Sequence, residues 1–88
     1  MNDVDLRIES DGDYGIWVDN SPVTIVNGRA HPPLHLSAGP HVAAWIVVGA
    51  KGTKIKIIVV VNGAPVVVFD SEIPDASGSY SSTGGFNV

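Results

Sequence analysis

The sequence contains no cysteine, few leucines and few basic residues, with 3 Leu and 5 Lys or Arg among 88 residues. The absence of cysteine excludes disulfide bonds, thiolate nucleophiles and zinc sites with cysteine ligands. Acidic residues outnumber basic ones by 9 to 5, so the net charge of −4 argues against nucleic acid or an anionic membrane as the main partner. No apolar run approaches the roughly 20 residues of a membrane-spanning helix.

Valine and isoleucine supply most of the large apolar residues, with 14 and 8 copies. The sequence also contains 10 Gly and 6 Pro. β-Branched side chains favour strands over helices, while Gly and Pro favour the tight turns between strands. The hydrophobic share of 44% excludes disorder of the chain as a whole. Together these features predict an all-β fold, a small antiparallel β-sandwich or barrel of about seven strands.

The composition changes near the C-terminus. Residues 1–74 carry the apolar pattern and are expected to form a single all-β domain, whereas residues 75–88 are rich in serine and glycine. Such a composition predicts a flexible C-terminal tail. At the other end, Met1–Asp5 is acidic and lacks the basic and apolar segments of a signal peptide, so the cytoplasm is the default expectation for the compartment.

Two segments near the N-terminus alternate between apolar and polar residues, which predicts half-buried strands. The apolar face of the first segment carries Val4, Leu6 and Ile8. The apolar face of the second segment carries Tyr14, Ile16 and Val18. Trp17 lies in the second segment but points to the other face, so we expect it on the outer surface. Asn27–Gly28 and Asn62–Gly63 predict hairpin turns.

Residues 41–69 predict a C-terminal three-strand antiparallel meander, because short turns join three apolar segments. The predicted strands are 41–48, 53–61 and 66–69. Each strand is apolar on both faces, although an antiparallel sheet in a small protein usually keeps one face in water. Either the first half of the chain wraps over both sides, as in a small barrel, or a second copy covers the exposed face.

The second arrangement is favoured, since so short a chain has no helix with which to cover another apolar face. We therefore predict a homo-oligomer, most simply a dimer, held together by the Val/Ile-rich meander. The candidate interface residues are Trp45, Val47, Ile58, Val60, Val67 and Phe69.

An aromatic ring on the outer surface near acidic residues supports a second hypothesis, a small-ligand or carbohydrate-binding domain. The candidate residues are Trp17, Tyr14 and Asp19. The succession of Ile16–Asp19, Pro33–Leu34 and Leu36–Val42 is similar to that of PEGA-type surface modules, with a strand, a turn and a Gly-x-His element. This resemblance covers less than half of the chain and implies a binding or structural module.

Three histidines raise a third hypothesis, a metal-dependent enzyme. Along one strand, His31 and His35 would lie roughly 13 Å apart, too far to share a metal ion, which leaves His35 and His41 as candidates. Leu36–His41 resembles the second metal motif of cupins, in which a glycine-containing turn precedes a histidine ligand. The first cupin motif, with its paired histidines and downstream glutamate, is missing, so we predict neither a metal nor another cofactor.

Catalytic chemistry has little support elsewhere in the sequence. Serine is abundant only in turns and near the C-terminus, without the strand–turn–helix context of a nucleophile elbow. We therefore predict a non-enzymatic interaction or structural module that self-associates. A ligand-binding domain and a cupin-like enzyme are the alternatives.

Overall fold

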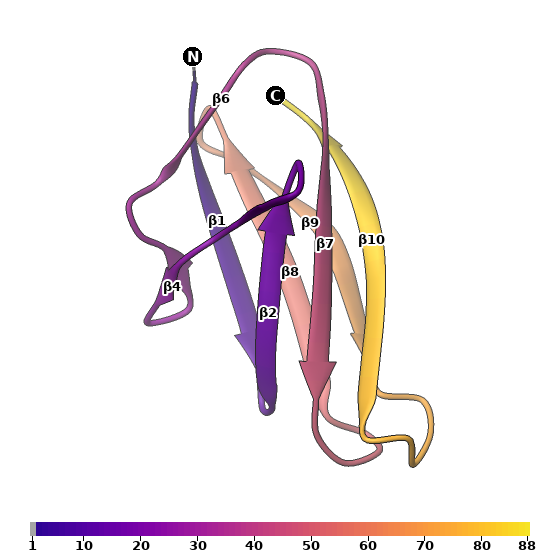
Figure 1. Ribbon diagram of the computed structural model, residues 1–88. Coiled ribbons are helices and arrows are strands. Elements are labelled where there is room, and N and C mark those ends of the chain that lie inside the picture. Colours follow the sequence, from indigo (N-terminus) through magenta and orange to yellow (C-terminus); the bar gives the residue numbers. More distant parts are fainter. Residues whose placement is uncertain (1) are drawn as a thin grey trace.

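The computed structural model describes residues 2–88, which form two stacked antiparallel β-sheets (Figure 1). The strands of the first sheet are β1 (Asn2–Ser10), β4 (Ile25–Val26), β5 (Arg29–Ala30), β6 (Leu34–Leu36), β8 (Lys54–Val61) and β9 (Ala64–Glu72). The strands of the second sheet are β2 (Asp13–Val18), β3 (Ser21–Pro22), β7 (Pro40–Val48) and β10 (Ser79–Asn87). The strand order is β4–β5–β1–β8–β9 in the first sheet, where β6 also pairs with β1, and β10–β7–β2–β3 in the second.

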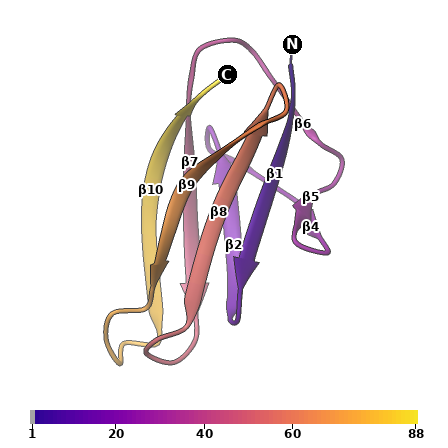
Figure 2. The ribbon, with the colours of Figure 1, turned by 180° about the vertical axis from the view of Figure 1, so that it is seen from behind.

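This arrangement confirms the predicted all-β fold and its sandwich architecture. Residues 2–88 form ten strands instead of about seven, because three of them, β3, β4 and β5, contain only two residues each. Seen from behind, β8 lies between β1 and β9 in the first sheet (Figure 2). The part of the chain that the structure describes has no helix of the length and apolar character needed to cross a membrane.

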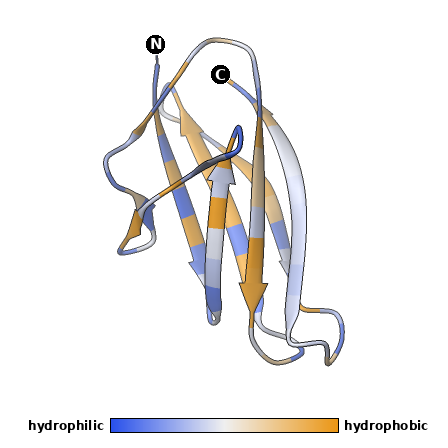
Figure 3. Cartoon of the chain, in the orientation of Figure 1, coloured by the Kyte–Doolittle hydropathy of each residue, from blue (hydrophilic) through white to orange (hydrophobic). Residues whose placement is uncertain are grey.

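The core lies between the two sheets and is filled by alternate residues of the long strands. The buried residues of β1, β2, β7 and β8 are Val4, Leu6, Ile8, Ile16, Val18, Ala43, His41, Trp45, Val47, Ile55, Ile57 and Val59. The alternation is visible as hydrophilic and hydrophobic bands along β1 (Figure 3). Each large aliphatic side chain buried in this way contributes about 1.5–3 kcal/mol.

One connection of the predicted three-strand meander differs from the structure. β8 and β9 pair through the Asn62–Gly63 turn, as predicted. β7, however, lies in the other sheet, between β2 and β10, so the segment after it crosses from one sheet to the other. Gly49 permits the sharp crossing, because a Cβ there would lie 2.6 Å from Oγ1 of Thr53. β7 and β8 therefore face each other across the core instead of lying side by side.

The predicted flexible tail also differs from the structure. Residues 79–87 form β10, which pairs with β7 along its whole length. Tyr80 and Phe86 point inward, and Phe86 is buried. Gly84 is required by packing, because a Cβ there would lie 2.9 Å from Cγ1 of Val68 and 3.3 Å from the ring of Trp45. A composition typical of flexible segments thus forms an integral strand of the sandwich.

The β8–β9 turn gives a prediction for stability. Asn62 and Gly63 have φ angles of 51° and 78°, and nothing lies within 4 Å of a Cβ added at Gly63. Gly63→Val therefore meets no clash, but forces a β-branched residue into the left-handed region, and we expect it to lower the free energy of unfolding by about 1–2 kcal/mol. Urea denaturation measures the change. Gly63→Asn is the matched control, since Asn tolerates positive φ, and an equal loss in both variants would contradict this explanation.

Candidate functional site: the outer face of the second sheet

The outer face of the second sheet is continuously apolar along β7 and the neighbouring part of β2. Even-numbered residues of β7 point outward, and Val42 is 52% exposed. On β2, Trp17 lies opposite Ala44, and Gly15 lies opposite Ile46. We call the resulting surface the apolar face, and its residues are Trp17, Val42, Ala44, Ile46 and Val48. Such a row of exposed apolar residues makes this face the candidate interaction surface.

Trp17 lies flat on this face. A Cβ added at Gly15 would lie 3.2 Å from Cη2 of the indole, so the ring extends along β2 over Gly15. The side chain remains 38% exposed. A side chain at position 15 would press on the indole, so glycine there lets the ring take this orientation without a shift.

A shallow groove of about 410 Å³ runs beside Trp17. Its lining residues are Trp17, Ala44, Trp45, Ile46, Ser81, Ser82 and Thr83. Trp17, Ala44 and Thr83 lie in one row across β2, β7 and β10, so the small side chain of Ala44 separates the indole from the hydroxyl of Thr83. The groove combines an aromatic wall with hydroxyl groups and has no charged lining residue, which suits a neutral, amphipathic partner.

The outer face of the first sheet has a different character, because charged residues interrupt its apolar ones. Arg7 lies opposite Ile58 and Asp5 lies opposite Val60. Arg7 Nε also forms an ion pair of 2.9 Å with Asp5 Oδ2. Exposed ion pairs of this kind add little stability, but they keep the surface solvated. The apolar residues on the outer face of the first sheet therefore lie among charged ones.

The structure divides the six predicted interface residues between the core and this charged face. Trp45 is 2% exposed, Val47 is buried, and the ring of Phe69 packs 4.6 Å from that of Trp45. These three residues belong to the core of a single chain. Ile58 and Val60 are half-buried on the outer face of the first sheet, where Val67 is 54% exposed. The six residues therefore do not share one surface.

The apolar face was missed as a site, although its residues alternate visibly in the sequence of β7. Both faces of the segment 41–48 are apolar, so the pattern alone does not tell which one points inward. The structure resolves this because Trp45, the largest residue of the strand, fills the core and leaves Ile46 and Val48 outside.

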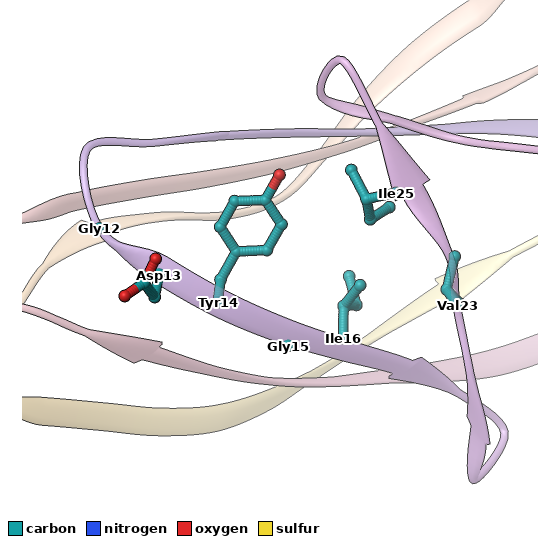
Figure 4. Close-up of a pocket in the computed structure, with 7 residues that line it drawn as sticks. All are labelled: Gly12, Asp13, Tyr14, Gly15, Ile16, Val23 and Ile25. Carbon is teal, nitrogen blue, oxygen red and sulfur yellow. The ribbon is translucent and has the colours of Figure 1, made fainter.

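The three predicted ligand-binding residues lie in three different places. Trp17 is on the apolar face, as expected. Tyr14 points to the opposite side of β2, into a separate pocket of about 360 Å³ that Ile16 and Ile25 also line (Figure 4). Asp19 lies in the turn after β2 and contacts His41. The structure therefore leaves Trp17 without the two predicted companions.

Asp19 and His41 form a hydrogen-bonded pair at one end of the sandwich. His41 Nδ1 lies 2.5 Å from Asp19 Oδ2, and His41 Nε2 lies 2.8 Å from the carbonyl oxygen of Ser37. Both partners are acceptors, so both ring nitrogens donate when the imidazole is protonated. The bond to Asp19, and then that to Ser37, raises the pKa of His41. The bond from His41, and then that from the Val42 N–H, lowers the pKa of Asp19.

The two candidate metal ligands are not brought together. His41 uses both nitrogens in the pair just described, whereas His35 lies on β6 of the other sheet, with Nδ1 2.6 Å from Asp3 Oδ1. Among residues 2–88 there is no group of three or more His, Cys, Asp or Glu side chains that could hold a metal ion. Within the segment Leu36–His41, which resembles a cupin motif, His41 instead links the turn after β2 to the carbonyl oxygen of Ser37.

No protein-family model, curated protein or solved structure matches this chain. None of these comparisons supports the resemblance of short segments to cupins or to PEGA-type modules.

The Asp19–His41 pair predicts a pH-dependent stability. Raising the pKa of His41 stabilises the fold below the ordinary value of 6.5, and this contribution is lost as the pH rises through the raised value. Lowering the pKa of Asp19 stabilises the fold above the ordinary value of 3.8, and this contribution is lost as the pH falls through the lowered value. The pair is therefore most stabilising between pH 3.8 and 6.5.

We expect His41→Gln to reduce the free energy of unfolding most within that window and less at alkaline pH. Urea denaturation of the wild type and the variant over a pH series measures the difference. His35→Gln is the matched control, since that side chain is exposed beside Asp3. A difference between wild type and His41→Gln that is the same at every pH would contradict the role of the pair.

Proposed function

We propose that this protein is a non-enzymatic interaction module that self-associates through the second sheet. The observation that carries the proposal is the apolar face, where Trp17, Ile46 and Val48 remain exposed on a sheet whose inner side already forms a complete core. Burying such a face in a second copy removes the same apolar area twice, because a two-fold contact uses the same surface on both partners. The proposal keeps the function predicted from the sequence, but it places the interface on the outward residues of β7 and not on the six residues named from the sequence.

The contrast between the two outer faces supports this choice of surface. Cross-strand rows on the first sheet join opposite charges, with Glu9 opposite Lys56 and Lys56 opposite Asp70. Burying these groups in an interface costs free energy unless a partner replaces their hydration. The five residues of the apolar face carry no charge, and Asp13 lies only at its margin, opposite Val48, so desolvation of the centre of this face costs little.

Trp17 favours a second candidate function, the binding of a neutral carbohydrate. An exposed indole that lies flat on a sheet can stack against the apolar side of a sugar ring, and Ser81 and Thr83 supply hydroxyl groups at the other side of the groove. The two candidates differ in what covers Trp17. A sugar changes Trp17 fluorescence in protein that remains monomeric, whereas self-association protects the indole in the absence of any sugar.

Sedimentation of the wild type and two lysine variants tests the proposal. We expect the wild type to sediment above the 9.2 kDa of one chain at tens of micromolar, roughly the concentration at which micromolar contacts are populated. Ile46→Lys places a charge on the apolar face and is expected to lower the mass while circular dichroism stays unchanged. Val67→Lys, on the outer face of the first sheet, is the matched control and is expected to leave the mass unchanged.

A wild-type protein that stays monomeric at about 100 µM would overturn the proposal. If instead Val67→Lys lowers the mass and Ile46→Lys does not, the contact lies on the first sheet, around Ile58 and Val60.

A further inference from the structure

The edge strands in residues 2–88 other than β10 are short or protected. β3 and β4 contain two residues each, and β6, which pairs only with β1, contains three. β9 ends the first sheet on the other side, and it carries Pro65, two acidic residues, Asp70 and Glu72, and a bulge at Val68. Proline, charge and bulges are the features by which natural proteins prevent further strands from pairing at an edge.

β10 ends the second sheet and has none of these features. Its nine residues, Ser79–Asn87, include no proline and no charged side chain. Within the described residues only β7 pairs with it. β10 is pale, and thus near-neutral in hydropathy, along most of its length beside the more hydrophobic β7 (Figure 3). A long, uncharged edge of this kind is a template for an additional strand.

Hydrogen bonds at the two ends of β10 show which of its backbone groups are free. Gly39 and Val88 exchange two backbone hydrogen bonds of 2.8 and 2.9 Å, and the N–H of Gly49 donates to the carbonyl of Gly78 at 2.9 Å. Because hydrogen-bonded and non-hydrogen-bonded pairs alternate in an antiparallel ladder, the even-numbered residues of β10 bond to β7. The residues whose N–H and C=O groups point away from β7 are Ser79, Ser81, Thr83, Gly85 and Asn87.

These outward-facing residues are symmetric about Thr83, the central residue of β10. When two copies of β10 run antiparallel with Thr83 opposite Thr83, Ser81 lies opposite Gly85 and Ser79 lies opposite Asn87. Every outward-facing residue then meets another, and five facing pairs with two hydrogen bonds each give ten backbone hydrogen bonds. We infer that β10 pairs in this register with β10 of a second copy of the chain.

The side chains are compatible with this register. On the inner side of the sheet, Tyr80 of each copy lies opposite Phe86 of the other, and aromatic pairs across antiparallel strands are stabilising. Ser82 lies opposite Gly84, so no two bulky residues collide. No charged residue opposes another, because β10 has none.

This edge contact rests on the proposed self-association and adds a second surface to it. Trp17, Ala44 and Thr83 share one row, so the row continues through the two-fold axis to Trp17 of the other copy, five strand spacings or about 24 Å away. The two apolar faces then lie on the same side of one continuous sheet. Two such dimers can pack with their apolar faces together to form a tetramer. Backbone hydrogen bonds then form the contact between β10 edges, and side chains form the contact between apolar faces.

Single cysteine variants test the register directly, because the chain has no cysteine of its own. Thr83→Cys places the two thiols on the axis, with Cα atoms about 5.5 Å apart, within the range of a disulfide bond. Ser81→Cys is the matched control, since it lies on the same face of the same strand but about 13 Å along the strand from its counterpart. We expect mild oxidation to link Thr83→Cys into a covalent dimer and to leave Ser81→Cys unlinked on a non-reducing gel.

Thr83→Pro tests the backbone bonds of the edge. The Thr83 N–H points away from β7, so proline removes a bond of the edge contact and none within the sheet. We expect this variant to keep the circular dichroism of the wild type and to sediment at a lower mass. Ser82→Pro is the contrasting variant. The N–H of Ser82 bonds to β7, so the loss of this hydrogen bond is expected to damage the fold.

The outcomes separate the edge contact from the proposed function. A monomeric wild type overturns both. An assembled wild type in which Thr83→Cys stays unlinked, or in which Ser81→Cys links equally well, overturns the edge contact and leaves the apolar face as the contact. A linked Thr83→Cys with an unchanged mass for Ile46→Lys overturns the face contact and leaves the edge.

Discussion

The alternation of side chains along β7 is the constraint on which the rest of the structure depends. This strand pairs on one side with β2 and on the other with β10, so neither of its edges is free. One set of residues, with Trp45 at its centre, fills the core, and the alternate set, with Ile46 at its centre, lies in solvent. Because both sets are apolar, a strand that completes the core of one chain also leaves an apolar surface outside it.

The outer sides of the two sheets differ in the charge and polarity of their residues. On the first sheet, charged residues such as Arg7 and Lys56 alternate with the buried ones and keep the surface wet. On the second sheet the outward positions are apolar on β7 and are neutral serine, threonine, glycine or asparagine residues on β10, with Asp13 of β2 at the margin, opposite Val48. The first sheet therefore presents a charged outer side, whereas the second presents an apolar centre beside a long edge strand without charge, which is the combination on which the proposed self-association rests.

The sequence predicted the parts of this fold that depend on local patterns. The alternation in β1 and β2, the outward position of Trp17 and the Asn62–Gly63 turn follow from side-chain period and turn chemistry. The short connection after β7 was predicted as a hairpin turn. A connection of this length can either join two strands of one sheet or cross to the other sheet, and the sequence does not distinguish the two. The serine and glycine content of β10 predicted a flexible segment. Its order comes from backbone pairing with β7 and from the inward side chains of Tyr80 and Phe86, and composition does not reveal either.

The candidate site was predictable to a similar extent. Trp17 was expected at the surface, but its groove is completed by Ser81 and Thr83, more than sixty positions away in the sequence. Asp19 was expected to bind a ligand, yet it bonds to His41, a pairing that exists only after the turn after β2 meets the start of β7. Pairings of this kind depend on tertiary contacts that a single sequence does not specify.

Iodide quenching of tryptophan fluorescence as a function of protein concentration tests the central claim most directly. Trp45 is buried within one chain, so Trp17 is the residue that iodide can reach. We expect quenching to fall as the protein concentration rises, because association covers the apolar face. Quenching that stays constant while sedimentation shows an assembly would contradict the claim, since the face would then remain in solvent.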